Sequence, residues 1–329
     1  MATIYDVAKR AGVSIATVSA VLNKSTFVSP ELTKKVKVAV EELDYTINHL
    51  AHSLQTRSTR TVGMLIPDMG NPDPFYGQVV RGAEDVFRKK EYLLILGHTY
   101  NKVEEQSRYL KAFRARLVDG ILLFQAQGQD EELDRLLKAK KPVVFVGRIP
   151  AGVQADVVAT DIQLGTRMAI EHLYEKGHRR IGLVTVAASL SVSSFRLAGW
   201  RAALKHHGIQ ANESYVIEGE LSSETGRQAA AQLLSLSEPP TAIFADNLVI
   251  TTGILSVLQQ RGLRCPEDVE VVSSDDAEWL DVFKPPITTV VQPSYELGAQ
   301  AGELLLKRIR HPKRPRQQFL LRPQLKVRS

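Results

Sequence analysis

The side chains that most often carry enzyme chemistry do not fall into a recognisable catalytic pattern in this chain. Cys265 is the single cysteine, and it precedes Pro266 in a predicted loop with no evident partner. His206 and His207 fall near the end of a predicted helix, where solvated side chains are expected rather than metal ligands. The sequence lacks glycine-rich phosphate loops and the motifs H-E-x-x-H and G-x-S-x-G. We therefore expect no enzyme, no catalytic residue, no metal site and no cofactor.

The first 23 residues have a pattern that suits contact with nucleic acid. Thr3 and Asp6 form a T-x-x-D capping box, Gly12 ends the helix that follows, and Ser14 can cap a second helix. The outer face of that second helix carries small and polar side chains, which fit a major groove about 12 Å wide. Hydrogen bonds to phosphates can come from Ser14, Thr17, Ser19 and Asn23, and contacts to thymine methyl groups from Ile15 and Ala16. This spacing favours a helix-turn-helix over an ordinary small helical domain.

The elements that must position this outer face are three short helices within residues 1–44. Each has an apolar stripe at helical spacing, and the pair Ser29-Pro30 is typical of a helix start. The stripes consist of Ile4, Val7, Ala8 and Ala11, then Val18, Val21 and Leu22, then Leu32, Val36, Ala39, Val40 and Leu43. Residues 45–60 are different, because the stretch 48–55 can make only two helical turns and is too short to be stable alone.

Composition limits the class of protein. The 329 residues suit two or three globular domains, with 44% hydrophobic and 24% charged residues. No apolar run is long enough for a transmembrane helix, and the N-terminus lacks the apolar core of a secretory signal, so we expect a cytoplasmic protein. The net charge of +6 is uneven, because residues 307–329 carry nine Lys or Arg and no acid. We interpret this tail as a solvated basic end.

From Val62 onward, short apolar runs alternate with amphipathic stretches of helix length. Examples of the runs are VGMLIP, GILLFQ, PVVFVG, RIGLVTV and AIFADN. This rhythm is typical of parallel strands joined by helices and predicts an α/β fold with both faces of each sheet covered. About 270 residues are long for one such sheet, so two doubly wound halves with a cleft between them are expected.

Six segments spread over nearly the whole chain carry a resemblance to a known family. They are TIYDVAKRAGVSIATVSAVLN, VGMLIPDMGNPDPFYGQVVRGAED, EHLYEKGHRRIGLV, FRLAGWRAAL, CPEDVEVVSSDD and PPITTVVQP. In this order they resemble landmarks of the lactose-repressor (LacI/GalR) family of bacterial transcription regulators. The resemblance implies an all-α helix-turn-helix headpiece and a two-lobed, periplasmic-binding-protein-like (type I) effector domain of doubly wound parallel sheets.

The resemblance also implies domain boundaries. The headpiece would cover residues 1–47, a hinge helix and linker 48–60, and the effector-binding and dimerisation domain 61–329. The N-lobe would hold about 61–160 and 292–319, and the C-lobe about 161–291 and 320–329. The chain would cross between the lobes near Thr160-Asp161, Gln292-Pro293 and Phe319-Leu320.

The family's DNA contacts map onto the headpiece and hinge. Ile15 and Ala16 would face bases, and Leu54 would wedge into the minor groove at the centre of a palindromic operator. The other implied contacts, mostly to phosphates, are Thr3, Ser14, Thr17, Ser19, Asn23, Tyr45, Asn48 and Ala51. The chain shows no leucine heptads after the last predicted strand, so a homodimer is expected rather than a coiled-coil tetramer.

The family's effector contacts map onto the predicted cleft. Arg196 in FRLAGW matches an arginine that hydrogen-bonds ligand hydroxyls or carboxylates, and Asp275 in SSDD matches a ligand-binding aspartate. These two groups suit a sugar, although an ion pair between lobes or exposed charges at strand ends are the alternative. The other implied positions, for which a scaffolding role is equally open, are Phe75, Tyr76, Arg148, Asn247 and Gln292. Asp161 and Asp119 are interpreted as loop anchors.

Several positions depart from the family pattern. Ala20 stands where an arginine usually contacts guanine, and Ile47 replaces a proline before the hinge. Gly147 and Leu248 replace acids, Leu221 replaces an aromatic residue, and NPDPFY is two residues longer than the usual loop. These departures leave the identity of the ligand more open than the fold.

We therefore expect a sequence-specific DNA-binding transcriptional regulator, most commonly a repressor in this family. A small sugar-like effector bound between the lobes would control its operator affinity, by induction or by corepression. Two alternatives are a sugar-binding protein without DNA function and an α/β enzyme. The helix-turn-helix pattern argues against the first, and no catalytic constellation supports the second.

Overall fold

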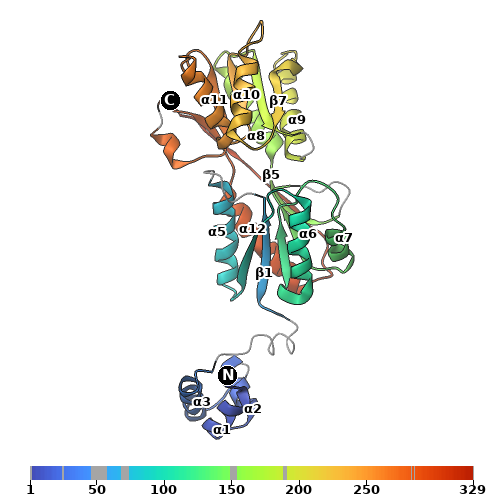
Figure 1. Ribbon diagram of the computed structural model, residues 1–329, viewed down its shortest axis with the longest axis vertical. Coiled ribbons are helices and arrows are strands. Elements are labelled where there is room, and N and C mark those ends of the chain that lie inside the picture. The colour runs from blue at the N-terminus through green and yellow to red at the C-terminus, as the bar shows by residue number, and fades with distance from the viewer. Residues whose placement is uncertain are drawn as a thin grey trace. The chain divides into compact units, whose positions relative to one another are not determined.

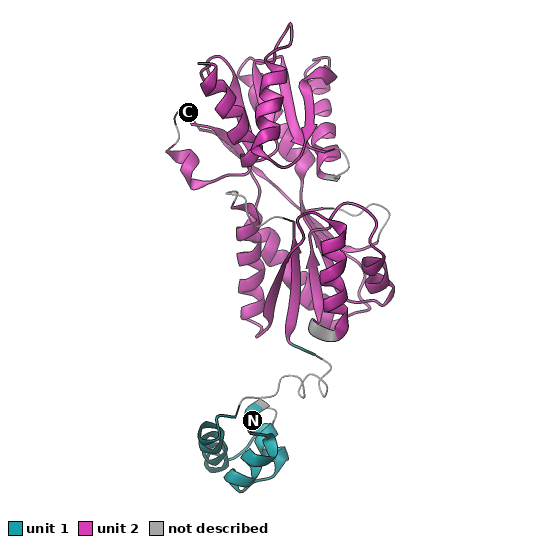
Figure 2. Cartoon of the chain, viewed as in Figure 1, with its two compact units in different colours: residues 1–59 teal, residues 60–329 magenta. Residues whose placement is uncertain are grey.

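The computed structural model describes residues 2–23, 26–45, 58–67, 74–148, 154–187, 191–282, 284 and 286–328. The chain divides into two compact units, residues 1–59 and 60–329 (Figure 2). The first unit holds helices α1 (Ile4–Ala11), α2 (Ile15–Asn23) and α3 (Pro30–Glu42). The expected hinge helix at 48–55 lies outside the described residues.

The headpiece helices begin and end where the sequence places their caps. The backbone N–H of Thr3 donates to Asp6 Oδ2 at 2.8 Å, and the N–H of Asp6 donates to Thr3 Oγ1 at 3.4 Å. Gly12 ends α1 in the left-handed region with φ +66°, and the Thr17 N–H donates to Ser14 Oγ at 3.1 Å. A core between the three helices is built from Val7, Ala8, Val18, Val36 and Ala39. The predicted three-helix arrangement is confirmed.

The first sheet of the second unit contains six parallel strands in the order β11-β5-β4-β3-β1-β2. Its strands β1 and β5 are labelled in Figure 1. The strands are β1 (Thr61–Ile66), β2 (Leu93–His98), β3 (Gly120–Leu123), β4 (Val143–Val146), β5 (Asp156–Thr160) and β11 (Gln318–Leu321). Helices α5 (Phe75–Arg88) and α12 (Ser294–Arg310) cover one face, while α6 (Val103–Ala112) and α7 (Glu131–Lys138) cover the other. A π-helical turn, Phe113–Leu117, follows α6. Side chains alternate between the faces, since Val62, Met64 and Ile66 pack towards α5 and α12 and Leu65 packs the other way.

The second sheet has the order β12-β10-β9-β8-β6-β7 and is parallel except for β12, which runs antiparallel to β10. Its strands are β6 (Ile181–Val186), β7 (Val216–Gly219), β8 (Ala242–Ala245), β9 (Glu270–Ser274), β10 (Thr288–Val291) and β12 (Gln324–Lys326). Helices α8 (Ile162–Glu175) and α9 (Ser191–His206) pack together, as do α10 (Ser223–Leu233) and α11 (Leu248–Gln260). Two 3-10 turns cover Glu213–Tyr215 and Glu278–Asp281. The predicted α/β class with two doubly wound sheets is confirmed.

The chain passes between the two sheets after β5, after β10 and after β11. The third passage differs from the expectation of Phe319-Leu320, because Leu320 and Leu321 still pair with Ala159 and Thr160 of β5. The ladder continues as the Asp161 N–H donates to the Leu321 carbonyl at 2.9 Å. Pro323 has no N–H to extend the ladder, so the chain leaves this sheet after Leu321. None of the helices in the described ranges is long and apolar enough to cross a membrane.

Candidate functional site

The positions assigned to a ligand all come after the carboxyl ends of parallel strands. Phe75 and Tyr76 open α5 after β1, and Arg148 follows β4. In the second sheet Arg196 lies in α9 after β6, and the positions that directly follow β8, β9 and β10 are Asp246 with Asn247, Asp275, and Gln292. Open parallel sheets bind ligands outside the carboxyl ends of their strands.

A buried ion pair holds Arg196 in place. Its Nη2 lies 2.6 Å from Asp246 Oδ1 and also donates to the Asp246 carbonyl at 3.2 Å. The other carboxylate oxygen of Asp246 accepts from Thr185 Oγ1 at 2.8 Å and from the Val186 N–H at 2.9 Å. Both charged side chains are 5% exposed. The sequence reasoning missed Asp246, although its position directly after the apolar run AIFA was a usable signal.

Asp275 and Gln292 form a second contact at the same edge. Gln292 Nε2 donates to Asp275 Oδ1 at 2.8 Å, and the Asp275 N–H donates to the Val290 carbonyl at 2.9 Å. Asp275 is 8% exposed and has φ +69°, in the left-handed region that aspartate tolerates better than most residues. Held backbone strain of this kind is concentrated at binding sites.

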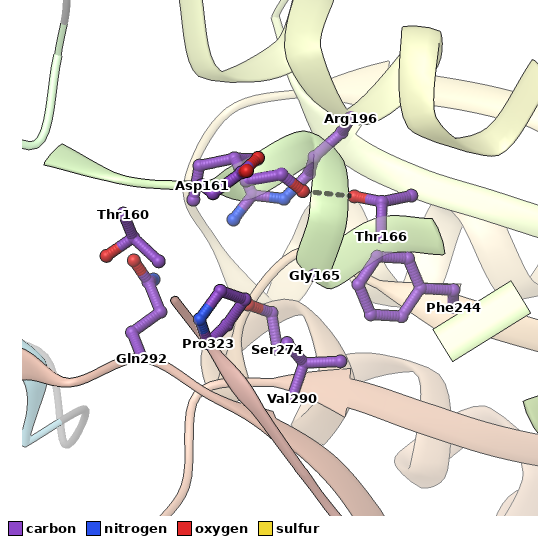
Figure 3. A pocket seen from close by; sticks show the side chains of 11 residues that line it. Thr160, Asp161, Gly165, Thr166, Arg196, Phe244, Ser274, Val290, Gln292 and Pro323 are labelled. Carbon is purple, nitrogen blue, oxygen red and sulfur yellow. Dashed lines mark hydrogen bonds between the residues drawn. The ribbon is translucent and has the colours of Figure 1, made fainter. Parts of the chain in front are cut away.

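A small pocket lies where the chain passes between the sheets (Figure 3). Arg196 and Gln292 line it together with Thr160, Ser274 and Phe244, whereas the other five predicted ligand positions do not. Its volume of about 10 Å³ has room for a single water molecule. Within the described chain, the buried Thr160 Oγ1 has no hydrogen-bond partner. This pocket therefore contains a polar group that a bound molecule can satisfy.

Asp161 and Asp119 anchor backbone, in agreement with the interpretation from sequence. Asp161 also lines the small pocket, where its Oδ1 accepts from the Leu164 N–H at 2.9 Å and caps α8. Asp119 Oδ2 accepts from the Arg60 N–H at 3.1 Å. Both carboxylates thus hold the ends of secondary-structure elements.

Three aromatic rings gather at the carboxyl edge of the first sheet. Tyr76 packs edge-on against Phe75 and Phe124, with both centroid distances 5.2 Å. Gly147 has φ +71°, and a Cβ there would lie 2.7 Å from the Phe124 ring. Because Phe124 fills this space, an acid at position 147 does not fit. The departure of Gly147 from the family pattern therefore has a packing reason.

The side chains of Arg148 and Asn247 form hydrogen bonds within the protein. Arg148 Nη1 donates to Asn101 Oδ1 at 2.8 Å and to the Gln125 carbonyl, and burial lowers the pKa of its guanidinium from the ordinary value. Asn247 caps α11, since its Oδ1 accepts from the Ile250 N–H at 2.9 Å. Leu248, which stands where the family usually has an acid, is 2% exposed and belongs to the hydrophobic core.

The face of α2 predicted to read DNA is open. Ser14, Ile15 and Ala16 are exposed, and Thr17 and Ser19 are half-buried. Two other predicted DNA contacts also have roles within the headpiece. Thr3 caps α1, and Tyr45 packs against the headpiece core. The remaining predictions concern the side chain of Asn23 and residues Asn48, Ala51 and Leu54, which lie outside the described part of the chain.

Comparison with known proteins decides the family. The family model for bacterial regulatory proteins of the lacI family matches residues 3–48, and the model for a periplasmic binding protein-like domain matches residues 170–329. The chain is 37% identical to the HTH-type transcriptional repressor PurR of Vibrio atlanticus (strain LGP32) over 331 residues, covering all of this chain and 98% of the relative. The chain belongs to the lacI family. It is a DNA-binding transcriptional regulator under the control of a small molecule.

Two solved structures resemble this lacI-family regulator over nearly its whole length. The lac repressor dimer bound to operator and the anti-inducer ONPF has a TM-score of 0.87 and 28% identity, covering 99% of this chain and 98% of that one. The complex of the transcriptional regulator CelR with cellobiose has a TM-score of 0.77 and 32% identity, covering 100% and 99%. The family fold thus extends from the headpiece to the last strand.

Proposed function

We propose that this regulator represses transcription from a palindromic operator and that a sugar or sugar derivative sets its operator affinity. The effector binds at the carboxyl edges of the two sheets, beside the three passages of the chain. The observation that carries the proposal is that two charged side chains at these edges are held in place. Asp246 forms an ion pair with Arg196, and Gln292 donates a hydrogen bond to Asp275. The similarity to CelR supports a sugar as the effector, since the solved complex of CelR contains cellobiose.

The polar groups suit a ligand rich in hydroxyls. The Asp275 carboxylate can accept hydrogen bonds from two hydroxyls, and the guanidinium groups of Arg196 and Arg148 can donate to oxygens. Phe75, Tyr76 and Phe124 offer the apolar surface against which one face of a ring can pack. A ligand held by both lobes favours their closure and so shifts the equilibrium between two forms of the dimer. Coupling of this kind typically changes affinity by about 5–150-fold.

We propose further that the protein works in the cytoplasm, where its DNA is, and has no catalytic activity. Its relatives are named as transcriptional repressors. Asn247 uses its Oδ1 to cap α11, so we propose that its side-chain Nδ2 contacts the ligand. The Tyr45 ring packs against the headpiece core, so we propose that its hydroxyl contacts DNA.

The base-reading role of Ile15 gives a first prediction. Replacing Ile15, which is 38% exposed, by serine removes an apolar contact to a thymine methyl group. A mismatched base pair in a specific site typically costs about 1–3 kcal/mol, so the variant is expected to lose up to this much discrimination at one base pair of each half-site. Selection of binding duplexes from a random pool, followed by sequencing, measures this preference. Val38→Ser, which removes an exposed apolar side chain from α3, is the matched control and should select the wild-type operator. If Ile15→Ser also selects it, Ile15 does not read a base.

The edge strand β2 supports a homodimer. It is the last strand of the first sheet, and its side chains include Leu93, Ile95 and Leu96 at 72%, 42% and 36% exposure. An exposed apolar edge strand is a template for pairing with another chain, and palindromic DNA needs two headpieces. We propose that β2 forms the interface with a second copy of this chain.

A charge on β2 is expected to break the dimer. Leu93→Lys places an ammonium group in the proposed interface, where it has no partner and loses its hydration. Sedimentation velocity should then show a monomer at concentrations where the wild type is a dimer. Leu320→Lys is the matched control, because Leu320 is 58% exposed on β11 at the opposite edge of the same sheet. A dimeric Leu93→Lys variant would exclude this edge from the interface.

A further inference from the structure

The amino edge of the first sheet carries an excess of positive charge that the helix-turn-helix does not explain. All six strands are parallel, so the segments that precede them meet at one edge. The described residues of these segments are 58–60, 89–92, 118–119, 139–142, 154–155 and 311–317. They contain eight cations and two acids, Glu91 and Asp119. The cations, called the basic edge below, are Arg60, Lys89, Lys90, Lys140, Lys141, Lys313, Arg314 and Arg316.

The opposite edge of the same sheet provides an internal comparison. The described residues that follow the strands there include three cations and two acids: Lys102, Arg148 and Arg322 with Asp130 and Asp161. The charge excess is therefore a property of one edge and not of the lobe as a whole. Part of it comes from the basic tail, which the sequence alone suggested was only a solvated end.

Hydrogen bonds join neighbouring segments of the basic edge into one surface. The Leu93 N–H donates to the Arg60 carbonyl at 2.8 Å, and Arg60 Nη1 donates to the Lys90 carbonyl at 3.3 Å. Lys141 Nζ donates to the Val118 carbonyl. With strands about 4.8 Å apart, the row from β11 to β2 is about 24 Å long. A duplex lying along it presents about 14 phosphate charges over that length.

A buried guanidinium fixes the segment that brings the tail to this edge. Arg308 is 2% exposed, and its Nε and Nη2 donate to the two carboxylate oxygens of Asp156 at 2.7 and 3.1 Å. The same guanidinium donates to the carbonyls of Pro312 at 3.0 Å and Pro315 at 2.9 Å. Asp156 also accepts from the Gln317 N–H at 2.9 Å. The backbone that carries Lys313 is thus held in one conformation while its side chain stays exposed.

Several cations of the basic edge are exposed and can bind an external anion. Lys89, Lys90, Lys140 and Lys313 are exposed, and none of them pairs with a carboxylate of the described residues. By contrast, Arg316 pairs with Asp156 at 3.4 Å, and Arg314 donates to Gln317. Four unpaired ammonium groups held on a firm surface fit a polyanion.

We propose that the basic edge binds the phosphate backbone of the DNA duplex that the headpiece holds. The linker from the headpiece enters the second unit at Arg60, within the basic edge itself. Tyr45 and Ser58 are separated by 12 residues, a length of chain that spans at most about 45 Å. A duplex bound by the headpiece therefore stays within reach of this edge. The contact is to phosphates and carries no base specificity.

The test compares two full-length variants that lose the same charge at different places. The first combines Lys89→Gln, Lys90→Gln, Lys140→Gln and Lys313→Gln. The control combines Lys111→Gln, Lys205→Gln, Arg261→Gln and Lys284→Gln, four exposed positions outside the basic edge. Fluorescence anisotropy measures the affinity of each for a 40-base-pair duplex of arbitrary sequence (about four helical turns) at several salt concentrations. Sedimentation and thermal melting first establish that both variants fold and assemble as the wild type does.

Each phosphate contact contributes about 0.9 to the slope of log affinity against log salt concentration. The basic-edge variant is expected to lose about 1 to 3.6 of that slope, while the control keeps the wild-type value. Equal slopes for the two variants, whether unchanged or reduced alike, would overturn the proposal. An unchanged slope together with lost binding to polyglutamate would overturn it in favour of an acidic protein partner.

Discussion

Replacing Asp246 by alanine is expected to lower the free energy of unfolding by about 3–5 kcal/mol, because it leaves a buried guanidinium without its counter-ion. The Arg196 side chain is 5% exposed, and the nearest carboxylate oxygen lies 2.6 Å from its Nη2. The substitution also removes the acceptor of the Thr185 hydroxyl and of the Val186 N–H, both of which stay buried. Urea unfolding followed by circular dichroism measures the loss.

Glu213→Ala is the matched control for this experiment. It removes the partner of Arg201 in the same lobe, where the ion pair is about half exposed and has a distance of 2.8 Å. Exposed pairs contribute about 0–1 kcal/mol because water screens both charges. Similar losses for Asp246→Ala and Glu213→Ala would mean that the protein does not depend on the buried pair.

Replacing Asp275 by asparagine is expected to weaken effector binding by about 10–100-fold, which corresponds to about 1.5–3 kcal/mol for lost bonds to a charged acceptor. Asparagine has nearly the same shape and tolerates the φ of +69° found here, so the backbone and the stability should change little. Isothermal titration with the effector measures the change.

Asp281→Asn tests whether this effect is local. Asp281 lies in the same lobe, and its carboxylate accepts from Lys326 Nζ at 3.0 Å and Arg328 Nε at 2.8 Å, away from the small pocket. It should bind the effector as the wild type does. An Asp275→Asn variant with wild-type affinity would remove Asp275 from the proposed site.

The features that could be predicted from the sequence are those set by neighbours along the chain. The capping box of Thr3 and Asp6, the left-handed Gly12 and the cap at Ser14 each depend on a few adjacent residues. The parallel strands were also predictable, because a strand covered on both faces must be a continuous apolar run.

The features that could not be predicted depend on contacts between distant segments. Arg196 and Asp246 are 50 residues apart, and the pairing of β6 with β8 brings the segments that follow these strands together. The sequence predicts the third passage too early, because the strand end is set by the ladder between β11 and β5. The sequence predicts only a solvated basic end for residues 307–329. The carboxylate that anchors this segment through Arg308 belongs to Asp156, which lies 152 residues earlier in the chain.

The central claim is that a small molecule bound in the second unit controls DNA binding by the first. The most direct test begins with a thermal-shift screen of sugars, sugar phosphates, sugar acids and nucleobases, since a ligand that binds only the folded state raises its stability. The operator affinity of the full-length protein is then measured by anisotropy with and without the ligand found. We expect the affinity to change by about 5–150-fold in either direction, and operator DNA to change the ligand affinity by the same factor. A ligand that saturates the protein and leaves operator affinity unchanged would contradict the account.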